Sequence, residues 1–303
     1  MKNYLLILIS FFSIPAFAQD DLLNMLENEN PDKPSPVYAT FKSTRVINLQ
    51  SNETMKKKHL DFRIQHRFTP LDFTAGNNYG AYNLFGLDGA VLRLGFEYGI
   101  TDKLMVGAGR STIGKTYDFM LKYKILQQTT KGKRAMPFSL NYFGNMGINT
   151  LAWSDPKRSN LFTSRLSFVN QLIITKKFND HVSLIVSPTL VHYNLVDSVK
   201  NPNDIFALGI GGSFKISRSS RFNIEYIPRL NGRDAFNGLY HDAFAIGFDI
   251  ETGGHVFQLH FTNAGGLIEQ QFVARTTDEF NGVSKLRFGF NLSRTFSMEK
   301  EGK

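Results

Sequence analysis

The sequence predicts an all-β fold, a transmembrane antiparallel β-barrel of about twelve strands within a range of 10–14. Three observations lead to this fold class. Apolar and polar residues alternate in about a dozen segments, and most of these have the length of roughly ten residues that a tilted strand needs to cross a bilayer. A leader typical of exported proteins precedes them. The links between the segments alternate between short and long, as they do in outer-membrane barrels.

Residues 1–18 have the three parts of a cleaved signal peptide. Lys2 gives the positive start, residues 4–12 form an apolar core, and Ala16 and Ala18 form the small-residue cleavage site. The apolar core is shorter than the ~20 residues that a membrane-spanning helix needs. We therefore expect export and location in the outer membrane of a Gram-negative bacterium.

The composition narrows the class further. The chain contains no cysteine, which excludes disulfides, thiolate metal sites and thiol nucleophiles. Beyond the leader no apolar run has the length of a spanning helix, so closed β-structure is the way to satisfy backbone groups in lipid. The formal net charge of +9 is spread over alternating positions and turns, so we expect lumen and loop charge rather than nucleic-acid binding.

Residues 19–58 form a periplasmic segment in the predicted organisation, followed by the barrel at 59–297 and a tail at 298–303. Residues 20–36 contain three prolines, which favour a loosely ordered tail. Residues 37–49 are β-prone but alternate poorly. An additional strand there would place the two ends of the barrel on opposite sides. We therefore expect a plug inside or below the barrel, with an extra strand as the alternative.

Twelve segments are candidate strands. They are 59–68, 89–100, 104–111, 116–126, 137–148, 161–178, 181–194, 206–216, 222–230, 244–251, 257–261 and 285–296. The last alternates almost without a fault, and Arg294 is the one exception on its apolar face. The alternation is weaker in 137–148, 161–178 and 181–194.

The links support a membrane barrel more strongly than any single strand does. Short links are 100–103, 179–180, 217–220 and 252–254, and long links are 69–88, 149–160, 195–204, 231–241 and 263–284. The two kinds fall on alternate sides, and the short link at 112–115 is the exception. A soluble β-sandwich is the alternative fold, but it gives no reason for alternating link lengths.

Charged residues on the polar faces of the strands are the candidates for a functional site, because these faces line the lumen. The lumen-lining candidates are Arg63, Arg67, Arg93, Glu97, Lys122, Lys124, Asp249, Glu251 and Arg287, and Asp118, Lys215 and Glu225 are on the same faces. Two interpretations stay open. Either the charges line a water-filled passage and set its ion preference, or they pair with one another and fill a narrow interior.

Residues 109–116 match the phosphate-binding pattern G-x-x-x-x-G-K-[ST]. That pattern needs a helix after it, whereas residues 117–125 alternate with a period of two, so we expect a hairpin turn.

No other pattern carries chemistry. The seven histidines show no metal-ligating spacing, and we expect no metal site and no cofactor. A barrel-embedded hydrolase could pair Ser183 with His181 or Ser187 with His192, but neither pair has a distinguishing spacing. We therefore do not expect an enzyme.

Several strings resemble those of a known family. They are 39–45, 84–88, 97–102 and, as the most specific, 248–263. They are similar to the β-barrel proteins of Bacteroidota outer membranes that are catalogued as a domain of unknown function. The resemblance covers roughly residues 38–297. It implies a barrel in the outer membrane and brings no substrate or catalytic residue.

The function that these observations favour is passage of small solutes through a porin-like channel or transporter. Outer-membrane lipid is the expected surrounding, and the positive lumen residues favour anionic solutes. The alternative is a non-conducting barrel with a structural or partner-docking role, in which residues 20–36 bind a periplasmic partner. A barrel-embedded hydrolase is the third hypothesis.

Overall fold

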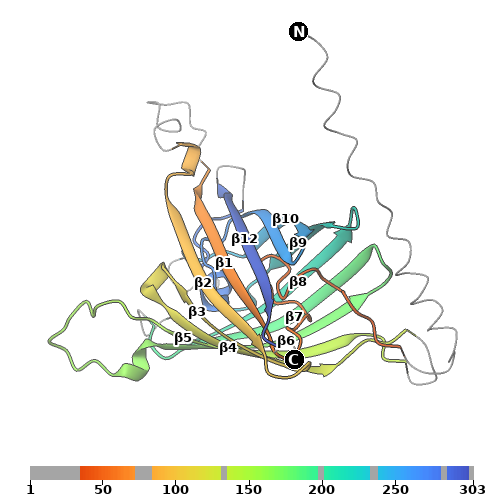
Figure 1. Ribbon diagram of the computed structural model, residues 1–303. Coiled ribbons are helices and arrows are strands. Elements are labelled where there is room, and N and C mark those ends of the chain that lie inside the picture. The colour runs from red at the N-terminus through yellow and green to blue at the C-terminus, as the bar shows by residue number, and fades with distance from the viewer. Residues whose placement is uncertain are drawn as a thin grey trace, which may run out of the picture.

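A computed structural model describes residues 35–71, 84–130, 135–196, 201–232, 238–280 and 285–299 (Figure 1). The predicted signal peptide at 1–18 and the predicted tail as far as residue 34 lie outside the described residues.

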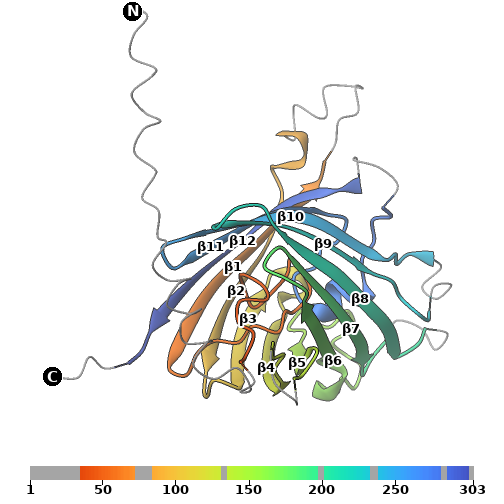
Figure 2. The ribbon, with the colours of Figure 1, turned by 90° about the vertical axis from the view of Figure 1, so that its right-hand side faces the viewer.

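Twelve antiparallel strands form a closed barrel, in which neighbours in sequence pair and β1 pairs with β12 (Figures 1 and 2). The strands are β1 (His59–Pro70), β2 (Ala90–Gly99), β3 (Leu104–Ser111), β4 (Tyr117–Leu126), β5 (Ser139–Ile148), β6 (Leu166–Lys177), β7 (Val182–Tyr193), β8 (Asp204–Lys215), β9 (Ser220–Ile227), β10 (Ala243–Thr252), β11 (His255–Thr262) and β12 (Arg287–Ser297). This architecture confirms the predicted fold class. His59 lies opposite Ser297, so the barrel begins and ends at the same rim.

We call this rim the short-turn end and the opposite rim the long-loop end. The links at the short-turn end are 100–103, 127–138, 178–181, 216–219 and 253–254, and those at the long-loop end are 71–89, 112–116, 149–165, 194–203, 228–242 and 263–286. The alternation of short and long links is therefore present with two departures. The link 127–138 is long at the short-turn end, and 112–116 is short at the long-loop end.

The link 112–116 accounts for the phosphate-loop pattern. It holds one 3-10 turn, η2 (Ile113–Lys115), in which Gly114 has a φ of 62°, a backbone angle that favours glycine. The Ser111 N–H donates to the Thr116 carbonyl at 2.8 Å and closes the hairpin. A strand follows this turn, as expected.

The outer face of the barrel is apolar. Along β4 exposed and buried side chains alternate, with Phe119 and Leu121 exposed and Asp118 and Lys122 buried. Rings of neighbouring strands contact each other there, as Phe62 and Phe96 do with centroids 5.1 Å apart. Such a face suits contact with acyl chains.

Arg294 interrupts the apolar face of β12 close to the short-turn end. Its guanidinium lies 4.9 Å from the centroid of the Phe296 ring, and a long side chain at this rim can reach the membrane interface. None of the helices among the described residues is long and apolar enough to cross a membrane.

The inner face is mixed rather than uniformly polar. Phe143, Val169, Ile173, Ile185 and Val191 on β5, β6 and β7 are buried inside the barrel. They belong to one apolar cluster that also includes residues from outside the wall. Apolar residues on both faces are the reason why the alternation of these strands is weak in the sequence.

Candidate functional site

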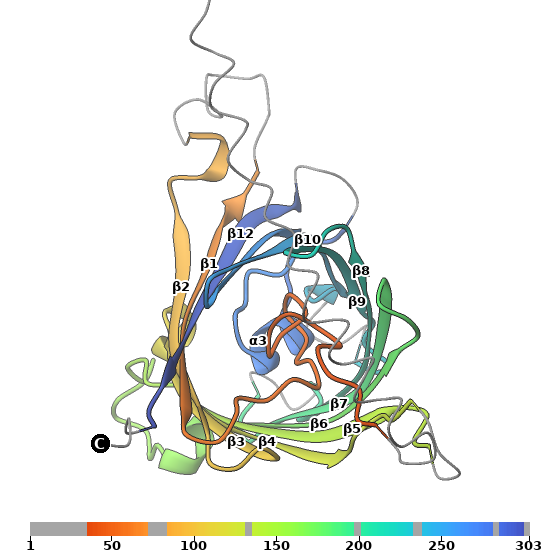
Figure 3. The same cartoon turned by 45° about the vertical axis from the view of Figure 1, so that its right-hand side comes forward.

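Two segments occupy the interior of the barrel (Figure 3). The first, residues 37–55, comes from the N-terminal side and is called the plug. The second, residues 263–278, belongs to the link between β11 and β12 and is called the inner loop; it contains α3 (Glu269–Ala274). All six residues of α3 are buried, and Val46 and Leu49 of the plug are fully buried as well.

The plug enters and leaves the barrel at the short-turn end. Before it, Pro36 forms a bridge with Thr129, and after it the Lys58 N–H donates to the Gly99 carbonyl at 2.9 Å. Between these points the chain folds back on itself, with a bridge between Arg45 and Gln50. The predicted segment 37–49 therefore lies inside the barrel, and the twelve strands close without it.

The tip of the plug is held by one carboxylate of the wall. Glu225 on β9 accepts backbone N–H groups from Ile47 at 3.3 Å, Asn48 at 2.7 Å and Leu49 at 3.1 Å. Successive backbone N–H groups form a concave donor site that favours an anion. Glu225 thus fixes the turn at the deepest point of the plug.

Some of the basic residues predicted to line the lumen hold other parts of the plug. Lys122 donates to the carbonyls of three plug residues, Thr44, Ser51 and Glu53, at 2.8, 3.0 and 3.2 Å. Arg63 donates to the Thr44 hydroxyl at 2.8 Å. These charges therefore face protein groups in this structure rather than open water.

Other polar wall residues add to this attachment. Arg67 donates to the Asn48 side-chain oxygen at 2.6 Å. Gln258 on β11 donates to the Val46 carbonyl at 2.7 Å, and Asn291 on β12 donates to the Ile47 carbonyl at 3.1 Å.

The remaining candidates have different positions. Arg93 makes a two-pronged ion pair with Asp118 at 2.9 and 2.5 Å, which joins β2 to β4 within the wall. Glu97 accepts the Thr44 hydroxyl of the plug at 2.5 Å. Asp249 is buried and accepts an N–H of Gln258 at 3.0 Å.

Three candidates are not deep in the lumen. Glu251 is exposed at the short-turn rim, where it pairs with Lys42 of the plug. Lys124 is half-buried near the same rim. Arg287 lies at the long-loop end and pairs with Asp278 of the inner loop at 2.6 Å. Glu251 has the same inward-facing parity as Asp249 on β10 but lies at the rim, where the last residues of the strand are exposed.

Glu53 is a buried carboxyl within the plug. Burial raises its pKa above the usual range, although hydrogen bonds from the backbone N–H groups of Phe41 and Thr40 oppose the rise. These N–H groups donate to one Glu53 oxygen at 3.3 and 2.9 Å. Glu53 therefore links the two arms of the plug, and its burial shifts the equilibrium of this carboxyl towards the protonated form.

The inner loop and the plug meet at one buried acid. Glu269 of α3 accepts hydrogen bonds from Arg45 and from Gln50 of the plug, both at 2.7 Å, and none of the three side chains is exposed to solvent by more than a trace. A movement of either segment would leave a buried charge without its partner. The two segments are thus coupled.

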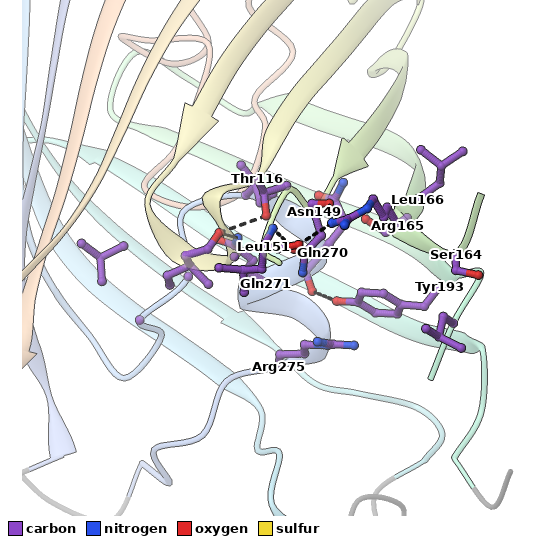
Figure 4. A pocket seen from close by; sticks show the side chains of 18 of the residues that line it. Thr116, Asn149, Leu151, Ser164, Arg165, Leu166, Tyr193, Gln270, Gln271 and Arg275 are labelled. Carbon is purple, nitrogen blue, oxygen red and sulfur yellow. Dashed lines mark hydrogen bonds between the residues drawn. The ribbon is translucent and has the colours of Figure 1, made fainter. Parts of the chain in front are cut away.

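The neighbours of Glu269 on α3 attach the inner loop to the wall at the long-loop end (Figure 4). The Gln270 side chain donates to Asn145 of β5 at 2.7 Å, and its carbonyl accepts the Tyr193 hydroxyl of β7 at 2.5 Å. The Gln271 side chain donates to the Ile113 carbonyl of the β3–β4 turn at 3.2 Å.

Arg45 and Glu269 were not predicted as site residues. They are 224 positions apart and lie in segments without strand alternation, so no local pattern points to either. Gln258 and Asn291 do lie on the polar faces of predicted strands. That alternation would have found them if uncharged polar residues had been included.

Among the described residues, no group of three or more histidine, aspartate or glutamate side chains could hold a metal ion. Ser183 is buried in the barrel while His181 is exposed in a turn. Ser187 faces inward, and His192 pairs with Asp204 at 2.7 Å. The serine and histidine pairs considered for a hydrolase are therefore not assembled.

Comparison with known proteins identifies the family. Residues 41–296 match the family model described as a membrane bound beta barrel domain (DUF5777). This match confirms the resemblance to a β-barrel family of unknown function, while an origin in Bacteroidota stays a prediction. No curated protein matches the sequence.

Solved structures of similar fold include outer-membrane channels. An outer membrane channel from Pseudomonas putida F1 is 13% identical with a TM-score of 0.50, over 81% of this chain and 98% of that chain. The KdgM porin is 10% identical with a TM-score of 0.46, over 78% of this chain and 99% of that chain. At these identities the Pseudomonas channel supports the barrel fold alone.

Proposed function

The chain belongs to the family of membrane-bound β-barrel domains, and from this premise we propose that it is an outer-membrane channel for small solutes. The plug closes the passage in the state described above, and withdrawal of the plug opens it. The two interpretations of the lumen charges then describe two states of one molecule: the interior is filled when the plug is in place, and the charges line a passage when the plug is withdrawn.

The polar attachment of the plug is the observation that carries this proposal. Most of the hydrogen bonds between wall and plug join a wall side chain to the plug backbone: Lys122 donates to plug carbonyls, and Glu225 accepts plug N–H groups. Water can replace a backbone partner of this kind when the plug leaves, so that even a hydrogen bond to a charged side chain contributes only ~1.5–3 kcal/mol net of its exchange with water. The attachment is therefore compatible with reversible release.

The wall that the plug covers has two sides. The polar side carries ten buried charged residues of the strands, five of each sign: the basic Arg63, Arg67, Arg93, Lys122 and Arg221, and the acidic Asp61, Glu97, Asp118, Glu225 and Asp249. The opposite side carries the apolar residues of β5, β6 and β7. A passage with these sides suits small solutes with a polar and an apolar part. The predicted preference for anions then depends on Arg63, Arg67 and Lys122, which release the plug when the passage opens.

Planar-bilayer recordings of the full-length protein test the proposal. We expect rare openings of the unmodified protein and sustained conductance when residues 37–55 are replaced by a glycine-serine linker. Lys122→Met should raise the open probability about tenfold or more, because hydrogen bonds to a charged group are worth ~1.5–3 kcal/mol and each ~1.4 kcal/mol is a factor of ten. The control is Lys103→Met, in the exposed β2–β3 turn at the short-turn end, and this variant should leave the open probability unchanged.

A barrel that still folds without the plug but does not conduct would contradict the proposal. Heat-modifiable gel migration distinguishes such a folded barrel from a misfolded one. That outcome would favour the non-conducting barrel, in which the buried ion pairs have a structural role only.

A further inference from the structure

A pocket of about 800 Å³ lies at the long-loop end, next to α3. Its wall combines the β3–β4 turn, the β5–β6 link, the end of β7 and the inner loop. The volume is within the range of ~300–1,000 Å³ that is usual for small-molecule sites. The pocket lies outside the plug interface, and none of the hydrogen bonds that hold the plug tip comes from its lining.

One part of the pocket is apolar and aromatic. Trp153, Leu151 and Leu166 from the β5–β6 link and the start of β6, and Leu195 after β7, line it together with Ile113 and Ile268. Such a lining favours an apolar or aromatic body in the ligand.

The charged residues of the lining are all basic. They are Arg165, Arg275 and Arg287, and no aspartate or glutamate is among the described residues that line the pocket. Arg287 is already neutralised by Asp278. Among the described residues, no carboxylate lies within ion-pair distance of Arg165 or of Arg275.

Aromatic rings and loop carbonyls hold these two arginines in place. Arg165 lies 4.0 Å from the centroid of the Trp153 ring and donates to the carbonyls of Asn149 at 2.9 Å and Leu151 at 2.6 Å. Arg275 lies 4.3 Å from the centroid of the Tyr193 ring (Figure 4). A guanidinium stacked on a ring keeps its edge available for a carboxylate.

We propose that this pocket binds a small organic carboxylate with an apolar or aromatic body. Arg165 and Arg275 receive the carboxylate, and the ring of Trp153 and the leucines contact the body. Binding in the pocket would act on α3, because Ile268, Gln270 and Gln271 line the pocket. Glu269, which lies in the same stretch of chain, holds Arg45 of the plug. This link to the plug rests on the proposed channel function, whereas binding itself does not.

The tryptophan gives a direct readout of binding. Trp153 is the only tryptophan of the chain, so the fluorescence of the full-length protein in nanodiscs reports on the pocket. The probes are 4-phenylbutyrate, its neutral amide and 4-phenylbutylamine, which share one body and differ in charge. We expect saturable quenching by the carboxylate, with a Kd at least tenfold lower than that of the amide, and no saturation by the amine.

Variants assign the effect to the two arginines. Arg275→Gln and Arg165→Gln should each raise the Kd for 4-phenylbutyrate at least tenfold and reduce the preference over the amide. Arg158→Gln, on an exposed residue of the same link, is the matched control and should change the Kd less than twofold. In calorimetry with Trp153→Phe, the heat of binding should persist without the fluorophore.

Equal affinity for carboxylate and amide, or an unchanged Kd in both arginine variants, would overturn the inference. Heat-modifiable migration verifies that each variant is folded. The outcome is separable from that of the channel proposal. A barrel that conducts without the plug but binds no probe contradicts the pocket, and one that binds the probe but never conducts contradicts the channel.

Discussion

Individual residues of the lumen have tasks that their side-chain chemistry dictates. A basic residue facing a polypeptide backbone donates to carbonyls, as Lys122 does to three of them, and an acidic residue accepts N–H groups, as Glu225 does. The alternation in the sequence places these side chains on the inner face. It does not identify their partners, because the partner is a segment with no alternation of its own.

Glu53 makes plug docking dependent on pH. Its pKa is raised in the docked state, so the docked state binds the proton more tightly than the released plug does. The stability that this group contributes to docking is therefore fully present below the ordinary carboxyl pKa and is lost as the pH rises through the raised pKa. We expect the open probability in bilayers to rise as the pH increases from the ordinary carboxyl pKa through the raised pKa of Glu53.

Glu53→Gln isolates the contribution of this carboxyl. Glutamine keeps the oxygen that accepts the N–H groups of Thr40 and Phe41, but it cannot ionise. The variant should lose the part of the pH dependence that comes from ionisation of Glu53. Lys122 and Lys124 lie near Glu53 and are unchanged in both proteins. Identical pH profiles of the two proteins would refute this role of Glu53.

At the scale of elements, the plug is the segment whose position matters most. A cysteine-free chain allows a single reporter thiol. Ser51→Cys places it at a fully buried plug position. An impermeant thiol reagent should label it slowly, while Ser219→Cys in an exposed turn should be labelled at once.

The labelling rate then measures how firmly Glu225 holds the tip. In the Glu225→Gln background we expect about 10- to 100-fold faster labelling of Cys at position 51, since hydrogen bonds to a charged group contribute ~1.5–3 kcal/mol. Glu251→Gln removes an exposed pair with Lys42, worth at most ~1 kcal/mol, and should accelerate labelling less than fivefold. Equal rates in the two backgrounds would show that the tip carboxylate does not hold the plug.

The elements also show how far a sequence pattern reaches. The closing strand and β4 alternate cleanly because one face meets lipid and the other meets polar groups of the interior. β6 and β7 alternate weakly because Val169, Ile173 and Ile185 face an apolar cluster within the barrel. Their weakness was a sign of a filled lumen, but a single sequence does not distinguish this cause from an irregular strand.

At the scale of the whole molecule, the barrel has an apolar outer surface and a packed interior. The sequence predicts the closure and the twelve strands, because each strand carries its own pattern and the links alternate in length. The meeting of the plug, the inner loop and the pocket depends on pairs such as Arg45 and Glu269, which are distant in the chain. Patterns of neighbouring residues in the sequence therefore do not predict which distant residues pair.

A charge on the outer surface tests contact with lipid. Leu121 lies midway along β4 and is exposed, so Leu121→Arg should destabilise the barrel in lipid vesicles by ~2–4 kcal/mol. Tyr117→Arg at the end of the same strand should cost at most ~1 kcal/mol, because the interface tolerates charge. Denaturant titration of refolding into vesicles measures both values. Equal costs for the two variants would contradict a membrane-spanning β4.

The hairpin path of the plug also has a mechanical consequence. Both of its ends leave through the same rim, so tension applied near Pro36 acts along the barrel axis and peels the contacts away one after another, starting with those closest to the exit. Sequential peeling requires far less force than breaking the same contacts together. Traction from the short-turn side would then extract the plug while every strand pair of the wall remains intact.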